Sequence, residues 1–424
     1  MQISVLTCTS CARVSRRVLA GVRVAGLAVA CAMLARPGLA QEAESRAAEL
    51  QRQRELKATD LRPHQPRGTE RLLLWLENRR SWERLLNPAQ GLYPKIGTIT
   101  PGGGLGLGAG FRKPGLFNQG SAFTAVAMAS FQAYWLARTQ LVLPELANGR
   151  LSAVLAVEAY DYANEAYYGP GPDSSRQAES FFGIRNTIGG GQIGLRVTPH
   201  VTIGGGIDYL MPVIDRARKS GTVQDRFTPF EVPGLDRQPD FGHYMAFAEV
   251  NTREPRGNPR VGGLYSLRYE RFDDVDLNAF NFHRVDAEIQ QYLSLFNQRR
   301  VLALRGLLSV SAADDGQRVP FYLQRTLGGP NDLRGFLRNR FRDDCLLVLQ
   351  AEYRWEVFTA MDAALFMDWG KVAASRQELD LDDLEHDYGV GVRFGTNNGV
   401  FLRIEGAFGS RDGGRMVFSF GNVF

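Results

Sequence analysis

The sequence predicts an all-β transmembrane protein, a 16-stranded antiparallel outer-membrane β-barrel that follows a short helical N-terminal segment. Three observations predict this fold. The chain opens with an export signal, most of its length alternates polar and apolar residues with a period of two, and glycine and aromatic residues are abundant. The 46 glycines exceed the roughly 30 expected at about 7% of a chain of this length. Together these features favour a protein that crosses a membrane with strands.

Residues 1–40 have the order of a secretory signal peptide. Four arginines between Arg13 and Arg23 precede an apolar run from Val24 to Ala35, and a small-residue cleavage site ends at Ala40. The run is shorter than the roughly 20 residues that a membrane-spanning helix needs. The alternative is lipidation at Cys31, which the preceding alanine-rich residues disfavour because such a site usually begins with leucine. We predict cleavage after Ala40.

Without its first 40 residues the chain is neutral. These residues contain five arginines and no acidic residue, so the 50 basic and 45 acidic residues of the chain become 45 and 45. The basic character therefore belongs to the targeting segment, and nucleic acid is not an expected partner. Cys345 is the one cysteine beyond residue 40, so no internal disulfide is expected to hold the exported domain.

Residues 41–90 are predicted to form a charged, partly helical periplasmic segment. Between Thr69 and Leu86, leucines and tryptophans recur three or four residues apart, which favours a helix with one apolar face. We interpret it as a short helix packed on the rest of the protein. An interfacial helix and a plug at the barrel mouth both stay open as alternatives.

Residues 91–424 are the predicted barrel. Between Cys345 and Val357 the odd positions are mainly apolar and the later even positions, such as Glu352 and Arg354, are polar. Lipid outside and a wet lumen inside produce this alternation. About sixteen such segments fit between Gly102 and Phe424, the even number that a single-chain bacterial barrel requires.

Glycines and long connections complete the predicted topology. The closely spaced glycines from Gly102 to Gly110 are interpreted as a glycine-rich first strand, because no Lys-Ser or Lys-Thr of a phosphate loop follows them. Long connections are expected at residues 215–240 and 312–343. The outer loops of such barrels are long and the periplasmic turns short.

Aromatic side chains end the chain. Phe418, Phe420 and Phe424 are predicted to lie on one face of a last strand that closes the barrel at the C-terminus. A terminal aromatic residue on a closing strand resembles the recognition signal of bacterial outer-membrane barrels. The alternative is a buried edge strand of a soluble sheet.

One segment has a recognisable motif. Residues 326–336, with the sequence TLGGPNDLRGF, and the following Arg340–Asp343 resemble the loop motif of the bacterial surface antigen family. That family includes BamA, TamA and the two-partner secretion transporters. Blocks similar to the family's later strands follow in order at residues 351–355, 366–372 and 388–394. The resemblance covers the barrel region and implies a place in the bacterial outer membrane.

The resemblance also implies a site in the lumen. The long loop is expected to fold back into the barrel, and its motif consists of Leu333, Arg334, Gly335 and Phe336. Its arginine is expected to reach acidic groups on the wall, and the predicted wall partners are Glu352, Asp368 and Gly370. A guanidinium suits this place because it pairs with carboxylates bidentately and stays charged. A plain loop arginine is the alternative.

The sequence departs from BamA and TamA before the barrel. The fifty residues from 41 to 90 are too few for one of the POTRA modules that those proteins carry there. Client docking through such a module is therefore not expected.

No catalytic residue, metal site or cofactor is predicted. The five histidines lack metal-ligand spacing, and no Gly-x-Ser-x-Gly nucleophile elbow occurs, so the protein is not expected to be an enzyme. The predicted function is protein insertion or export at the outer membrane, with outer-membrane lipid and client proteins as partners. The alternative is a passive pore or structural barrel that has kept the fold without assembly activity.

Overall fold

The computed structural model describes residues 89–424, apart from 101–102, 119, 297, 359–360, 397–398 and 420–421. The predicted signal peptide, nearly all of the predicted segment 41–90, and Phe420 lie outside the described residues. No helix in the described part of the chain is long and apolar enough to cross a bilayer.

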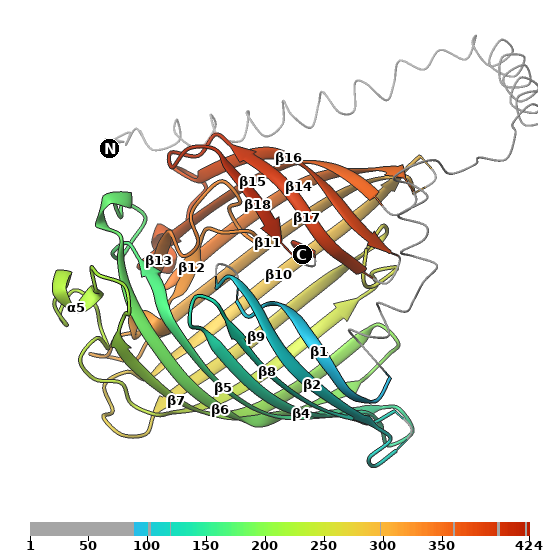
Figure 1. Ribbon diagram of the computed structural model, residues 1–424, viewed down its shortest axis with the longest axis horizontal. Helices are drawn as coiled ribbons and strands as arrows, with labels where there is room; N and C mark the ends of the chain where they lie inside the picture. The colour runs from blue at the N-terminus through green and yellow to red at the C-terminus, as the bar shows by residue number, and fades with distance from the viewer. Residues whose placement is uncertain are drawn as a thin grey trace, which may run out of the picture. The chain divides into compact units, whose positions relative to one another are not determined.

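Sixteen antiparallel strands form one sheet, which curls into a barrel (Figure 1). Each strand pairs with the next along the chain, except that the connection 314–344 separates the neighbours β11 and β14. The strands are β1 (Gly91–Thr98), β2 (Leu105–Pro114), β3 (Ala122–Ser130), β4 (Trp135–Leu146), β5 (Leu151–Tyr167), β6 (Ser180–Arg196), β7 (Val201–Arg216), β8 (Phe241–Asn251), β9 (Gly262–Asp274), β10 (Phe282–Leu295), β11 (Arg300–Ala313), β14 (Cys345–Phe358), β15 (Met361–Ala373), β16 (Glu385–Thr396), β17 (Gly399–Phe408) and β18 (Arg415–Ser419). The predicted fold class and strand number are confirmed.

The remaining elements are short. A two-stranded hairpin, β12 (Arg325–Leu327) and β13 (Phe341–Asp343), lies within the connection 314–344. Single helical turns occur at η2 (Arg176–Ala178), α5 (Val223–Arg226), η3 (Phe321–Leu323) and η4 (Arg376–Glu378).

The sheet begins earlier than the sequence predicts. Its first strand is β1, and the glycine-rich stretch interpreted as the first strand lies mostly in β2. β1 is short and contains Pro94, which lacks the N–H that a central strand must donate. An edge strand tolerates such a residue, so the usual strand signals are weak in this segment.

The barrel is apolar outside and polar inside. On β10, Val285, Ile289 and Leu293 are 36%, 56% and 44% exposed, whereas Arg284 and Gln290 on the opposite face are buried. A protein in water shows the reverse arrangement. Exposed aliphatic side chains around a polar interior are the arrangement that a lipid solvent requires.

Strand length changes around the barrel. β5 and β6 each have 17 residues, while β1 has 8 and β18 has 5. Among the described residues, the ladder of paired strands runs from β1 to β18 and leaves these two strands at its ends. The ends of the sheet are therefore its shortest part, and we call the boundary between β1 and β18 the seam.

Long connections pack together at one end of the barrel. Aromatic and aliphatic side chains from β5–β10 and from the connections 217–240, 275–281 and 314–324 form a buried cluster. Phe321 lies at its centre, with its ring centroid 5.6 Å from that of Tyr167 and 4.9 Å from that of Phe182. This end of the barrel is thus closed by a packed cap.

Candidate functional site in the barrel lumen

The connection 314–344 lies against the inner wall of the barrel. Its apolar side chains pack on inward-facing residues of β14 and β15, and every member of the cluster is at most 3% exposed. The cluster consists of Leu327, Leu333, Phe336 and Phe341 from the connection and Leu346, Val348 and Val372 from the wall. Burying this much apolar surface fixes the segment 333–336 in place.

Arg334 is the charged centre of this loop and is completely buried. Its Nε and Nη2 donate to the two oxygens of Asp368 at 2.7 and 2.8 Å, a bidentate pair. Its Nη1 donates to Glu352 Oε2 at 2.9 Å and to Glu405 Oε1 at 3.0 Å. The guanidinium carbon lies 3.4 Å from the ring centroid of Phe366, which adds a cation–π contact. The loop arginine is thus tied to β14, β15 and β17.

Sequence reasoning missed two members of this site. Glu405 on β17 is the third carboxylate at Arg334, and Asp387 on β16 accepts a hydrogen bond from the Gly335 N–H at 2.9 Å. Period-two alternation places each of them on the inward face of its strand. Their height relative to the loop depends on the register of the last strands, which a single strand's pattern does not reveal.

Further arginines surround the same carboxylates. Arg354 Nε donates to Glu352 Oε1 at 2.5 Å, and Arg393 pairs with Glu352 Oε2. Arg403 Nη1 donates to Glu405 Oε2 at 2.9 Å. The site therefore joins four buried arginines to three buried carboxylates, and Glu352 and Glu405 each pair with several of the arginines at once.

Two glycines allow the loop to approach the wall. A Cβ on Gly335 would lie 2.7 Å from Asp387 Cβ. A Cβ on Gly370 would lie 2.9 Å from Leu327 Cδ1 and 3.0 Å from the Leu347 carbonyl oxygen. Gly370, a predicted wall partner, therefore meets the loop through Leu327 rather than through the arginine.

The C-terminal residues differ from the prediction. β18 ends at Ser419. Within this strand, Phe418 points outward and is 67% exposed. Phe424 is instead only 8% exposed and packs beside Tyr292 of β10, with 6.2 Å between the ring centroids. The predicted single face of Phe418 and Phe424 on one strand is wrong, because the tail leaves the sheet and turns into the lumen.

A buried carboxyl in the loop gives a pH-dependent stability. Burial raises the pKa of Asp343, at the end of β13, to about 6. Below that pH the folded protein binds a proton that the unfolded chain, with an aspartate pKa of about 3.9, has already released. The contribution of Asp343 to the free energy of unfolding is therefore largest at low pH and falls as the pH rises from about 4 to 6.

Asp343→Asn is expected to stabilise the barrel by roughly 1–2 kcal/mol at pH 7.5 and to have little effect at pH 4. Urea midpoints of the purified protein at the two pH values measure the difference. Asp225→Asn is the control with the opposite sign, because its hydrogen bond with Arg216 lowers the pKa of Asp225. An equal gain from Asp343→Asn at both pH values would contradict the assignment.

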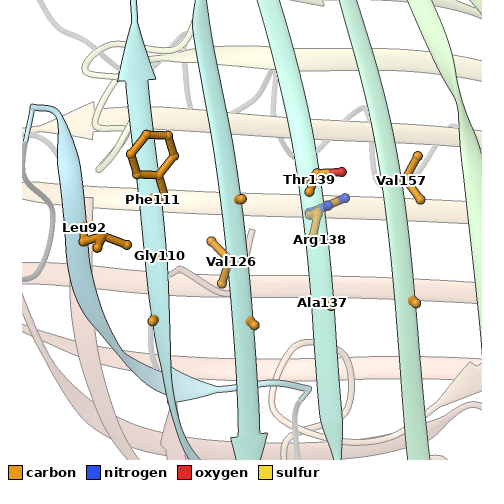
Figure 2. A pocket seen from close by; sticks show the side chains of 12 residues that line it. Leu92, Gly110, Phe111, Val126, Ala137, Arg138, Thr139 and Val157 are labelled. Carbon is orange, nitrogen blue, oxygen red and sulfur yellow. The ribbon is translucent and has the colours of Figure 1, made fainter.

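The outer surface near the seam is hollowed. Ala109, Ala127, Ala137 and Ala159 are register partners from β2 to β5, and they line a shallow depression of about 420 Å³. Figure 2 shows Leu92, Phe111 and Val157 around it, each from a different strand. The row of alanines therefore leaves a hollow in the outer wall, with larger side chains such as Leu92 and Phe111 at its edge.

Comparison with known proteins points to one family. The model of the Omp85 superfamily domain matches residues 234–424, which include the lumenal loop and all strands from β8 to β18. Residues 234–424 are therefore identified as an Omp85 superfamily domain. Together with the fold shared with BamA, this match supports a BamA/TamA-type Omp85 barrel of the bacterial outer membrane.

A solved structure of BamA shares the fold of this barrel. The crystal structure of BamA from Haemophilus ducreyi lacking POTRA domains 1–3 is 15% identical, with 78% of this chain and 70% of that chain covered and a TM-score of 0.58. CdiB from Acinetobacter baumannii and CdiB from Escherichia coli are each 12% identical over 77% of this chain. They are covered over 56% and 59% of their own lengths, with TM-scores of 0.47 and 0.49. No curated protein matches the sequence.

Proposed function

We propose that this Omp85 barrel inserts or exports proteins at the outer membrane, and that it uses the seam and the lumenal loop to do so. The observation that carries the proposal is the short ladder at the end of the sheet. Among the residues that the structure describes, β18 pairs with β17 over five residue pairs, from Arg403–Ser419 to Ala407–Arg415. Opening that edge breaks few backbone hydrogen bonds, each of which contributes a net of about 1 kcal/mol.

An edge strand exposed by opening the seam could pair with a strand of an inserting protein. The unpaired N–H and C=O groups of an edge strand are a template on which another chain can add a strand. On the other side of the seam, Leu92 and Ile96 of β1 are 80% and 53% exposed, so a strand added there would meet an apolar, lipid-facing row. Client outer-membrane or exported proteins and the surrounding lipid are the partners that this surface fits.

The lumenal loop supports the wall beside the seam. Arg334 binds Glu405 on β17, the neighbour of β18, as well as Asp368 and Glu352 on β15 and β14. Such a tie keeps the penultimate strand in place while the last strand moves. Members of the superfamily are assembly or transport barrels, which agrees with a non-enzymatic role of this kind.

The test is quantitative proteomics of outer-membrane fractions. A deletion strain is complemented with the wild-type gene, with Arg334→Ala, or with Arg185→Ala as the matched control. The Arg185–Asp215 pair is exposed, with 54% and 45% of the two side chains accessible. The abundance of the barrel itself is measured in every sample.

Selective loss of particular outer-membrane or surface proteins, repaired by the wild type and by Arg185→Ala but not by Arg334→Ala, is the expected result. An unchanged membrane proteome in the deletion strain would overturn the proposal. The passive pore or structural barrel would then be the better interpretation.

A further inference from the structure

We propose that the connection between β8 and β9, residues 252–261, is a plug in the periplasmic mouth of the lumen, and that the C-terminal tail holds it closed. The inference stands apart from the proposed function, because it concerns access to the lumen and not the handling of clients. At the same mouth the connections 147–150, 197–200 and 296–299 have four residues each, whereas the plug has ten. This mouth faces the periplasm because it carries the short turns.

The plug is folded rather than a loose turn. Glu254 and Val261 form an antiparallel bridge, and the Arg260 N–H donates to the Glu254 carbonyl at 2.9 Å. Asn258, near its tip, is only 7% exposed. A turn tip in solvent would be exposed, so the burial of Asn258 means that the hairpin is directed into the mouth.

Arg260 ties the plug to the barrel wall at β15. Its Nη2 donates to the two carboxylate oxygens of Asp362 on β15 at 3.0 and 3.2 Å. Its Nη1 donates to the Gln298 carbonyl, between β10 and β11, at 3.0 Å. In the sheet, β9 and β15 are separated by β10, β11 and β14, so this pair crosses the interior of the barrel. The side chains of Arg260 and Asp362 are 16% and 8% exposed, so water screens the pair little.

The tail touches both the plug and the wall. Asn422 Nδ2 donates to the Gly257 carbonyl of the plug at 2.7 Å. Val423 and Phe424 are 7% and 8% exposed and pack on Val301 and Ala303 of β11. Arg354 also stacks on the ring of Phe424, with its Cζ 5.5 Å from the ring centroid.

This arrangement couples the mouth to the last strand. Two residues of sequence separate the end of β18 from Asn422, so a large displacement of β18 withdraws Phe424 from β11 and removes the Asn422 contact from the plug. The mouth is closed while the tail is seated and opens when the last strand leaves its place.

The test measures access to a residue beneath the tail. Ala303 is completely buried in the tail's site, and cysteine is a small replacement for it. In an Ala303→Cys, Cys345→Ala background, the labelling rate by a membrane-impermeant maleimide is measured on the heat-resistant folded barrel in lipid vesicles. Slow labelling is expected in the otherwise wild-type protein.

Two changes open the plug in different ways. Arg260→Gln removes the pair with Asp362. In the second variant, Asn-Gly replaces residues 255–260, because the bridged Glu254 and Val261 can be joined by a two-residue hairpin turn. The matched control is Arg271→Gln on the same strand pair, which loses a bidentate pair with Asp314 at 2.7 Å on the opposite rim.

Both plug variants are expected to label at least about tenfold faster, the change that corresponds to ~1.4 kcal/mol of closing free energy. The control is expected to label at the wild-type rate. Unchanged labelling in the folded plug variants, or equal acceleration in Arg271→Gln, would overturn the proposal. If Arg260→Gln does not fold, the Asn-Gly variant, which keeps every strand and the wall residue Asp362, decides the question alone.

Discussion

Replacing Arg334 with alanine is expected to destabilise the barrel by about 3–5 kcal/mol, the cost of leaving a buried charge without its partner. Most of that cost falls on Asp368. Glu352 keeps Arg354 and Glu405 keeps Arg403, whereas Asp368 keeps two neutral donors, Gln350 Nε2 at 3.0 Å and the backbone N–H of residue 334 at 3.4 Å. A fully buried carboxylate with neutral donors alone is poorly compensated.

Urea unfolding of the purified barrel, followed by its loss of heat-resistant migration, measures the change. The exposed pair of Arg185 with Asp215 is the control, and its loss is expected to cost under about 1 kcal/mol. Adding Asp368→Asn to Arg334→Ala is expected to recover part of the stability, because it removes the orphaned charge. A single Arg334→Ala variant as stable as the wild type would mean that the loop is not held by this arginine.

Glu352→Gln is expected to be about as damaging, roughly 3–5 kcal/mol, although it changes the size of the side chain very little. One carboxylate oxygen of Glu352 accepts from Arg354 and the other accepts from Arg334 and Arg393. A glutamine has one acceptor oxygen and one NH₂ donor. In either orientation of its amide, an N–H group faces a guanidinium N–H group, and four buried arginines are left with two carboxylates.

A second substitution distinguishes charge from shape. Arg393→Met is expected to destabilise the wild type but to be neutral or stabilising in the Glu352→Gln background, since it removes surplus positive charge. The coupling between the two changes is expected at about 0.5–3 kcal/mol, as for residues within one ion-pair network. Additive effects in the urea midpoints would show that the two side chains do not share a network.

Much of the fold could be predicted from the sequence, because the membrane imposes a simple pattern. Because residues of a strand alternate between lipid and lumen, Glu352 and Arg354 could be assigned to the lumenal face from the sequence alone. The first strand was harder, since Pro94 and a length of eight residues weaken the alternation. The tail was predicted as strand because its pattern continues past Ser419, and only the three-dimensional position of β11 shows why Val423 and Phe424 turn inward.

The site was partly predictable for the same reason. Facing carboxylates on β14 and β15 follow from alternation together with the family motif, and the structure places both at Arg334. Glu405 and Asp387 required the relative heights of β16 and β17, which depend on the register of every intervening strand pair. A one-residue slip in any of these pairs would have turned such residues away from the lumen.

The fall in strand length toward the seam also has a consequence for the bilayer. Eight residues at about 3.3 Å per residue, tilted by about 40°, rise only ~20 Å, against the roughly 25 Å apolar band of outer-membrane barrels. β5, with 17 residues, exceeds that height easily. Lipid next to β1 must therefore compress or tilt its acyl chains to cover the protein, at a cost of fractions of a kcal/mol per ångström of hydrophobic mismatch. The barrel thus carries a fixed patch of strained, thinned bilayer on one side, where the elastic barrier to the passage of polar backbone is lowest.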